Sequence, residues 1–374
     1  MALGTVIALC CTAGAAAEGL PRYDHIFVIV AENKNYDQII GSEDAPRLNK
    51  LAKEYGLATN FYGEVHPSEG NYVAILGGDT FGINDDDPWS CEPFKISADC
   101  PYAFYPNYAP HSVSARSLMD QLADAKLAWK GYFEDLPEPG SLAIFNPSEE
   151  NPDANRPKYL YAAKHNGFVN FERVRQDAKI AEKIVPLEQF RSDFAAHALP
   201  NYAHIILNQC NDMHGLYGAQ PTPPADCVLE GRDPGKIAAL IRRGDKAIGD
   251  VVDEIMAAPV WSGRSNVAIV ITWDEDSYNS AGPQGCCSSD PASKANFGGG
   301  HIPTIVVTNH GPRHVEDPTP YNHYSLLRTT EDAFGIGEHL GFAAETGKGV
   351  RTMTPLFEVT ETSANAEGAG ATAR

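Results

Sequence analysis

The sequence is short of basic residues. Of its 374 residues, 29 are Lys or Arg and 49 are Asp or Glu, which gives a formal net charge of −20. Nucleic-acid binders and proteins that adhere to anionic lipid need clustered Lys and Arg, so we expect no nucleic-acid partner and no stable membrane association. A small anionic substrate is still compatible with this net charge, because one metal ion or a few hydrogen-bond donors directed at the substrate can outweigh it locally.

Cys-x-x-Cys pairs, internal repeats and linker-like stretches are also missing. The cysteine spacings therefore do not resemble a zinc site, and nothing divides residues 20–358, which we expect to form a single domain. The content of 43% hydrophobic and 9% aromatic residues is sufficient for a packed core, which argues against global disorder.

The two ends of the sequence differ from its centre. Residues 1–19 are apolar and end in small residues, although no Lys or Arg precedes the apolar stretch. This favours a signal peptide or its remnant, with a poorly ordered apolar N-terminus as the alternative; the stretch is shorter than the roughly 20 residues that span a bilayer. Residues 359–374 are polar and rich in small residues, which predicts a disordered tail.

Beyond residue 19 the chain has six cysteines, an even number that suits an oxidising compartment. Pairing of neighbours would join Cys91 to Cys100 and Cys210 to Cys227 in short loops, while Cys286 and Cys287 are adjacent and geometrically awkward. Six cysteines allow many connectivities, so the sequence leaves the pairing open. Together with the apolar N-terminus, they predict a secreted protein, extracellular or periplasmic.

Four apolar runs predict buried strands, and helical patterns lie between them. The predicted strands are His25–Val30, Tyr202–Leu207, Val267–Thr272 and Ile302–Thr308. The predicted helices cover 46–55, 114–125, 233–257 and 325–334. The strands are continuously apolar rather than alternating, which is typical of parallel strands covered on both faces. The alternation predicts the α/β class, as a three-layer sandwich with a mainly parallel central sheet.

Polar residues follow three of these strands. They are Glu32, Asn33, Asp212, His214, Asp274 and Glu275. In open α/β sheets the ligand site lies beyond the carboxyl ends of the strands, and carboxylates gathered there repel unless a cation neutralises them. Taken singly, Glu32 or Asp212 could cap a helix, and residues 274–276 could form a solvated loop. Taken together they predict a divalent metal site with oxygen ligands, for Ca²⁺, Mg²⁺ or Mn²⁺ rather than Zn²⁺.

Ser68 opens a predicted helix that contains residues 72–76. A serine at a helix N-terminus meets partial positive charge and free N–H groups, which favour a bound phosphate and a reactive hydroxyl. The alternative is a plain serine N-cap, with Asn71 in the first turn. His323, near the start of the helix at 325–334, is a candidate ligand or acid–base group, or else a capping-region histidine.

The other histidines are weaker candidates. His301 follows three glycines and precedes a strand, and His310 and His314 lie in a polar loop. Four more histidines have no other candidate site residues near them in the sequence and are interpreted as ordinary surface or core residues. They are His111, His165, His197 and His204.

Six motifs occur in one order between His25 and Ile336. They read HIFVIVAENKNYD, HPSEGNY, NDMHG, VAIVITWDED, HIPTIVV and NHYSLLRTTEDAFGI. In these the chain resembles the secreted phosphoesterase family of bacterial acid phosphatases and phospholipases C, with an alkaline-phosphatase-like fold. It most resembles the compact secreted acid phosphatases of the phosphatidylinositol-3-phosphatase type. One departure is Gly70, where relatives usually have proline.

The resemblance implies a role for each matching position. Ser68 would be the nucleophile that forms a phosphoserine, with His214 and His323 as further catalytic groups. The implied phosphate-binding residues are His66, Asn71 and Asp212. The implied metal ligands are Glu32, Asn33, Asp274 and Glu275.

The function predicted in this way is a secreted, metal-assisted phosphomonoesterase that acts on a small phosphate ester, which could be a phosphoinositide or another phospholipid headgroup. A divalent cation and a histidine proton donor suit phosphoryl transfer, which depends on charge stabilisation and positioning. One alternative is a phosphodiesterase of the phospholipase C kind, with the same catalytic groups. Another is a non-catalytic protein that binds metal or phosphate.

Overall fold

The computed structural model describes residues 20–150, 156–216, 223–229, 233–277, 284–287 and 298–359. The predicted signal segment and residues 360–374 of the predicted tail lie outside these ranges. So does most of the loop between the third and fourth predicted strands. Within the described ranges, no helix is both long enough and apolar enough to cross a membrane.

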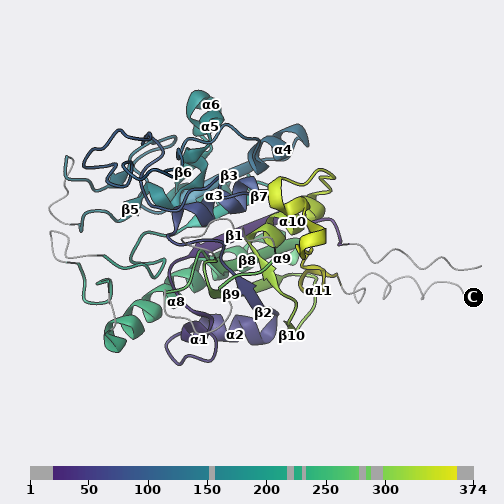
Figure 1. The fold of residues 1–374 in the computed structure, drawn as a ribbon. Helices are drawn as coiled ribbons and strands as arrows, with labels where there is room; N and C mark the ends of the chain where they lie inside the picture. Colours follow the sequence, from purple (N-terminus) through teal and green to yellow (C-terminus); the bar gives the residue numbers. More distant parts are fainter. Residues whose placement is uncertain are drawn as a thin grey trace, which may run out of the picture.

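A nine-stranded sheet forms the centre of the molecule (Figure 1). Its strand order is β10-β2-β9-β8-β1-β7-β3-β6, with β11 paired to β2. The strands are β1 (His25–Ala31), β2 (Gly56–Tyr62), β3 (Trp129–Phe133), β6 (Ile184–Pro186), β7 (Tyr202–Ile206), β8 (Val267–Trp273), β9 (His301–Thr308), β10 (Val315–Asp317) and β11 (Tyr321–Asn322). A separate hairpin joins β4 (Phe145–Asn146) to β5 (Tyr161–Ala162). The structure therefore confirms the α/β class and a large, mostly parallel sheet.

The direction of β9 differs from the prediction. Strands β1, β7 and β8 are parallel as predicted, but β9 runs antiparallel to both of its neighbours, β8 and β2. It lies inside the sheet, and all of its residues except His301 are buried. A continuous apolar run indicates that a strand is buried on both faces of the sheet. A parallel and an antiparallel strand can be buried equally, so the run does not predict the direction of the strand.

Helices cover both faces of the sheet. The α-helices are α1 (Tyr36–Ile39), α2 (Pro46–Glu54), α3 (Glu69–Gly77), α4 (Leu118–Asp124), α5 (Glu172–Gln176), α6 (Ala178–Ala181), α7 (Glu188–Ala195), α8 (Pro234–Ala257), α9 (Pro259–Ser262), α10 (His323–Phe334) and α11 (Thr354–Phe357). The 3₁₀ helices are η1 (Ala163–His165), η2 (Gly167–Asn170), η3 (Gly341–Ala344) and η4 (Thr346–Lys348). Helix α2 packs on α8, and α3 packs on α10. Right-handed crossovers place these two pairs on opposite faces, which gives three layers.

The helix boundaries follow local capping. Asp233 accepts hydrogen bonds from the backbone N–H groups of Gly235 and Lys236, so α8 begins at Pro234 as predicted. Helix α10 begins two residues earlier than predicted, because the Asn322 side chain accepts from the Ser325 backbone N–H. The predicted helix at 114–125 is shorter and begins only after Ser117.

The three neighbouring cysteine pairs form disulfides in the structure. They are Cys91–Cys100, Cys210–Cys227 and the adjacent Cys286–Cys287. The first two close the short loops that the sequence suggested.

Candidate functional site

The carboxyl ends of β1, β7 and β8 bring three carboxylates to one edge of the sheet. Ala31 lies opposite Trp273 in the parallel register, so Glu32 and Asp274 emerge side by side. The Glu32 N–H donates to the Asp212 carbonyl oxygen at 2.8 Å, and the Asn33 N–H donates to Asp274 Oδ1 at 3.1 Å. These side chains lie together as the strand ends predicted, and the three carboxylates are fully buried.

Ser68 lies at the N-terminus of α3 and faces these carboxylates. Its Oγ donates to Glu32 Oε2 at 3.0 Å and lies 3.3 Å from Glu275 Oε1. The side chain makes no capping bond to its own helix; the Glu69 N–H is instead directed to Asp86 Oδ1 at 3.3 Å. Ser68 is therefore not a plain N-cap.

The first turn of α3 requires the glycine at position 70. A Cβ atom there would lie 2.6 Å from the Ile83 carbonyl oxygen and 2.6 Å from Val65 Cγ1. Close approach of these segments therefore depends on a residue without a side chain. In the same helix, the Tyr72 hydroxyl donates to Glu32 Oε1 at 2.6 Å, which links α3 to the end of β1.

His165, interpreted from the sequence as an ordinary residue, lies inside the carboxylate cluster. Its Nε2 lies 3.2 Å from Glu32 Oε1, and its Nδ1 lies 3.2 Å from Asp212 Oδ2. Burial and the charge of Lys164 lower the pKa of His165 well below its usual value, so the ring is neutral and carries one N–H. If Nδ1 donates to Asp212, the Nε2 lone pair faces a carboxylate oxygen. That contact is repulsive unless a cation lies between the two atoms.

His214 completes this arrangement. Its Nε2 lies 3.1 Å from Lys164 Nζ, which can only donate, so Nε2 is the acceptor and Nδ1–H donates to the Gly215 carbonyl at 2.7 Å. Burial and Lys164 lower the pKa of His214 well below its usual value, which agrees with a neutral ring. Ligand atoms of Glu32, His165 and His214 all lie within 4.8 Å of one another. The cluster can hold a metal ion.

Two further observations fit a cation. Asn33 Oδ1 is buried and has no hydrogen-bond partner among the described residues, so an unsatisfied oxygen lies beside the carboxylates. Burial, and then the charges of Asp274 and Asp212, raise the pKa of Glu32 well above its usual value. Burial also raises the pKa of Asp274 to about 6 and that of Glu275 to about 8. A bound cation would restore all of these groups to their charged forms.

His66 lies behind the site. Its Nδ1 is paired with Glu275 Oε2, and its Nε2 lies 3.3 Å from Asp276 Oδ1. Burial opposes protonation of the ring, but hydrogen bonds to Asp276 and Glu275 raise the pKa of His66 to about 9. The protonated ring therefore fixes the two carboxylates, and it is not among the residues that line the pocket.

Two predicted site residues are engaged away from the pocket. The Asn71 side chain accepts from the backbone N–H groups of Glu64 and Val65 and donates to the Val65 carbonyl. His323 Nε2 bonds to the Trp273 carbonyl at 2.9 Å, and burial lowers the pKa of His323 to about 4. Neither residue is among those that line the pocket. Both support the backbone that carries the site.

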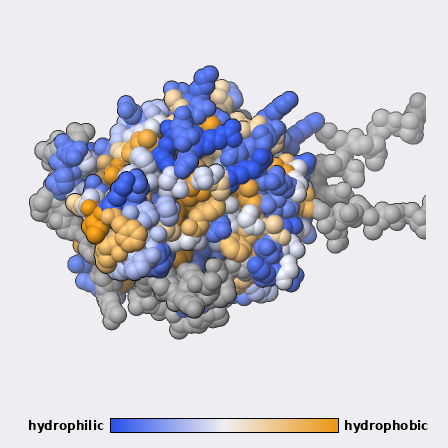
Figure 2. All heavy atoms as spheres, turned by 45° about the horizontal axis from the view of Figure 1, so that its top comes forward, coloured by the Kyte–Doolittle hydropathy of each residue, from blue (hydrophilic) through white to orange (hydrophobic). Residues whose placement is uncertain are grey.

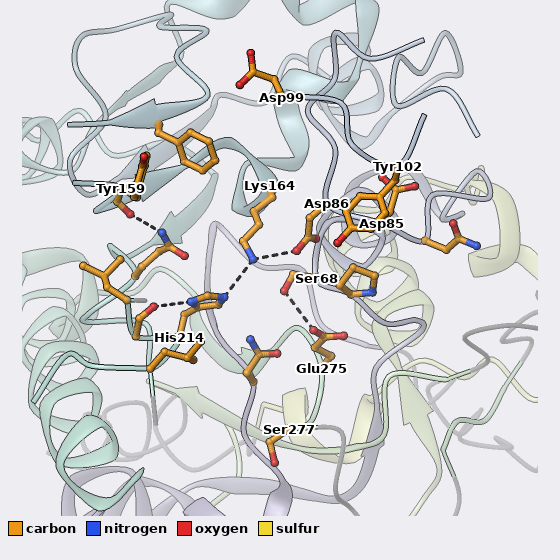
Figure 3. Close-up of a pocket in the computed structure, with 18 of the residues that line it drawn as sticks. Ser68, Asp85, Asp86, Asp99, Tyr102, Tyr159, Lys164, His214, Glu275 and Ser277 are labelled. Atoms are coloured by element: carbon orange, nitrogen blue, oxygen red, sulfur yellow. Dashed lines mark hydrogen bonds and ion pairs between the residues drawn. The ribbon is translucent and has the colours of Figure 1, made fainter. Parts of the chain in front are cut away.

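A pocket of about 1280 Å³ opens above Ser68 (Figure 3). Lys164 enters it from η1, between Asp86 Oδ2 at 3.0 Å and His214 Nε2 at 3.1 Å. Among the described residues that line the pocket it is the only Lys or Arg, whereas the lining acids are Asp85, Asp86, Asp99 and Glu275. Lys164 and Asp86 could not be found from the sequence, because neither follows one of the predicted strands or belongs to a motif.

Comparison with known proteins agrees with this geometry. The profile of the Phosphoesterase family matches residues 42–222 and 236–337. The phosphatidylinositol-3-phosphatase of Mycobacterium tuberculosis is 27% identical over 327 residues, which cover 86% of this chain and 81% of that protein. The acid phosphatase of Aspergillus fumigatus is 32% identical over 192 residues, which cover 51% of this chain but only 37% of that protein.

Solved structures show the same fold at low sequence identity. A protein of the alkaline phosphatase superfamily from Vibrio parahaemolyticus superposes with a TM-score of 0.50 at 11% identity, over 85% of this chain and 68% of that one. A lipoteichoic acid synthase from Listeria monocytogenes gives a TM-score of 0.50 at 12% identity, over 90% of this chain and 76% of that one. These similarities concern the fold alone.

Proposed function

The chain belongs to the phosphoesterase family and is a hydrolase of phosphoric ester bonds, and we propose that it is a metal-assisted phosphomonoesterase with Ser68 as its nucleophile. The observation that carries the proposal is the Ser68 hydroxyl, held 3.0 Å from a buried carboxylate oxygen of Glu32. It faces a pocket in which Lys164 is the one cationic side chain among the described lining residues. The phosphatase names of the matched relatives support a monoester substrate.

The proposed metal ligands are Glu32, His165 and His214, with Asn33 and Asp274 beside them. A metal ion at His214 Nε2 would replace the hydrogen bond from Lys164, which would keep its pairing with Asp86. The nitrogen donors move the expected metal from Ca²⁺ or Mg²⁺ toward Mn²⁺, Zn²⁺ or iron, because imidazole suits transition metals. When bound, such a cation supplies charge neutralisation of phosphate oxygens and lowers the pKa of a nearby hydroxyl or water. Asp212 would orient His165, as carboxylates commonly orient metal-bound histidines.

The residues of the chain can carry both steps of the reaction. Glu32 Oε2 accepts the Ser68 proton as Oγ attacks phosphorus, and the bond from phosphorus to the leaving oxygen breaks. Lys164 is the only Lys or Arg among the described residues that line the pocket, so it protonates the leaving oxygen in place of the predicted histidines. In the second step water gives its proton to Lys164 and attacks the phosphoserine, and Ser68 leaves with the proton held by Glu32.

Location and domain organisation belong to the same proposal. The disulfides and the apolar N-terminal sequence support a secreted protein. We place one catalytic domain at residues 20–358, since a single sheet joins its first and last strands. A phosphoinositide or another phospholipid headgroup remains the proposed natural substrate class, supported by the name of the mycobacterial relative.

The test is the Ser68→Ala variant, assayed on an aryl phosphate with divalent metal supplied. We expect hydrolysis to fall by at least about 1000-fold while the fold is retained, as expected for loss of a nucleophile. The matched control is Ser277→Ala, because Ser277 Oγ bonds to Asn35 and not to the carboxylates; it should keep most of the activity. A rate of hydrolysis by Ser68→Ala within tenfold of the wild-type rate would contradict the assignment of Ser68 as the nucleophile.

A comparison of two substrates distinguishes the phosphomonoesterase from the phosphodiesterase alternative. Wild-type enzyme should turn over a phosphomonoester faster than a phosphocholine diester, because a dianion offers Lys164 more charge. Faster turnover of the diester would favour the phospholipase C alternative.

A further inference from the structure

The pocket is larger than a phosphate group needs. At about 1280 Å³ it has room for a large leaving group beyond Ser68 and Lys164. Aromatic side chains line this outer part, and three of them remain substantially exposed. They are Tyr102 at 43%, Tyr105 at 45% and Phe145 at 37%. Rings left uncovered at the mouth of a catalytic pocket indicate a surface that a ligand covers.

The loop that carries Tyr102 and Tyr105 is anchored on both sides of Tyr102. The Cys91–Cys100 disulfide comes just before it in the chain, and the two cysteines pack with Ala103 and Tyr108 in a small core of their own. Asp87 Oδ2 accepts from the Tyr102 N–H at 3.2 Å. These contacts fix the backbone of the loop while the two rings stay in the pocket. Its exposed rings are therefore presented in a preformed arrangement.

The rings offer flat faces from two sides. Tyr102 and Tyr105 are nearly parallel, with an interplanar angle of 12° and ring centroids 6.3 Å apart. Phe145 meets Tyr159 edge to face at 4.9 Å, and both line the pocket from the segment around β4 and β5. Figure 3 shows Tyr159 on the left and Tyr102 on the right, with Lys164 between them. In Figure 2, apolar surface appears at the same end of the molecule as the loops on the left of Figure 1.

The charges of the pocket restrict the rest of the ligand. Asp99 lines the same outer region, while Asp85 and Asp86 lie nearer Ser68, where Asp86 is paired with Lys164 and Asp85 with His111. A second phosphate or carboxylate on the leaving group would meet these acids without a cation of its own, whereas an uncharged ring would not. Flat aromatic faces stack on a planar ring better than on a flexible chain, which must also be ordered.

On this basis we propose that Tyr102 and Tyr105 form a binding site for a planar aromatic ring on the leaving group, with Phe145 on the opposite wall of the pocket. The substrates selected in this way are monophosphate esters that carry such a ring and no second anionic group. The inference rests on the proposed phosphomonoesterase activity and replaces the phospholipid headgroup of that proposal with a narrower substrate class.

The experiment compares kcat/KM for three monoesters, 2-naphthyl phosphate, octyl phosphate and glycerol 1-phosphate. The double variant Tyr102→Ala/Tyr105→Ala should lose about 10-fold on the naphthyl ester, as expected for two stacking partners, and less than about twofold on glycerol phosphate. Tyr105→Phe, which keeps the ring, should retain the naphthyl selectivity. The matched control is Phe94→Ala, because Phe94 lies on the same loop, is 72% exposed and does not line the pocket.

Three outcomes would overturn the inference, and they are distinguishable. Equal losses on all three esters would assign the tyrosines a structural role. A loss on octyl phosphate as large as on the naphthyl ester would identify a site for an acyl chain or lipid instead of a ring. Failure of metal-supplied wild-type enzyme to hydrolyse any of the three would overturn the proposed function itself.

Discussion

Lys164 is the residue on which the proposed chemistry depends most after Ser68. It is the cationic side chain among the described residues that line the pocket, and it bonds to Asp86 and His214 there. Replacing Lys164 by methionine removes the proton donor. Esters with a poor leaving group need that proton, whereas esters with a good leaving group can react without it.

We predict that Lys164→Met lowers kcat on glycerol 1-phosphate by about 100-fold or more, the range for loss of a general acid, and lowers it less on 4-nitrophenyl phosphate. Parallel steady-state assays on the two esters measure the difference. Lys158→Met is the control, since Lys158 pairs with Glu149 and does not line the pocket. Equal losses on both esters would limit Lys164 to binding the phosphate.

Asp212 contacts both histidines that are proposed as metal ligands. Its Oδ1 accepts from the backbone N–H of His214 at 2.7 Å, and its Oδ2 lies 3.2 Å from the ring nitrogen His165 Nδ1. We predict that Asp212→Asn weakens metal affinity by about 10- to 100-fold, as loss of an orienting carboxylate does. Competition against a chromophoric chelator measures this directly. Asp226→Asn is the control, because Asp226 pairs with Arg243, and unchanged affinity in Asp212→Asn would argue against these histidines as ligands.

At the scale of elements, the sequence predicts best what hydrophobic runs and strand ends determine. The apolar runs locate β1, β7 and β8, and their polar ends meet because parallel strands end at one edge of the sheet. Strand β2 was not predicted, since its sequence mixes polar residues and glycine with apolar ones. The direction of β9 could not be predicted, because burial does not encode it.

The site residues that sequence reasoning missed lie on irregular segments. Lys164 and His165 come from the short helix η1, more than a hundred residues from Glu32, and Asp86 lies in a loop. No periodicity or spacing connects such residues, and only the fold brings them together. His323 shows the opposite case, because its motif suggested a site while its ring bonds to backbone at Trp273.

For the whole molecule, the net charge of −20 includes carboxylates that folding buries at a cost. Glu331, in α10 and far from the metal ligands in sequence, is one of them. Burial raises its pKa to about 7, although a hydrogen bond from the Leu340 N–H at 2.9 Å opposes the shift. Because the folded-state pKa is the higher one, its protonated form stabilises the fold fully below about pH 4.5, and this contribution is lost as the pH rises toward 7.

We therefore predict that Glu331→Gln is more stable than wild type at pH 8 by up to about 3 kcal/mol, and that the difference narrows toward pH 5. Urea unfolding across this range measures it. Glu338→Gln, at an exposed side chain, is the control and should not change the pH dependence. A constant difference between Glu331→Gln and wild type would contradict a titrating Glu331.

The central claim is a covalent phosphoryl transfer through Ser68. The most direct measurement is mass spectrometry of enzyme quenched in acid during turnover of an aryl phosphate with metal supplied. The account predicts one phosphate on the peptide that contains Ser68, absent without substrate and absent in Ser68→Ala. Rapid turnover with no phosphate on that peptide at any quench time, or with phosphate on another residue, would contradict it.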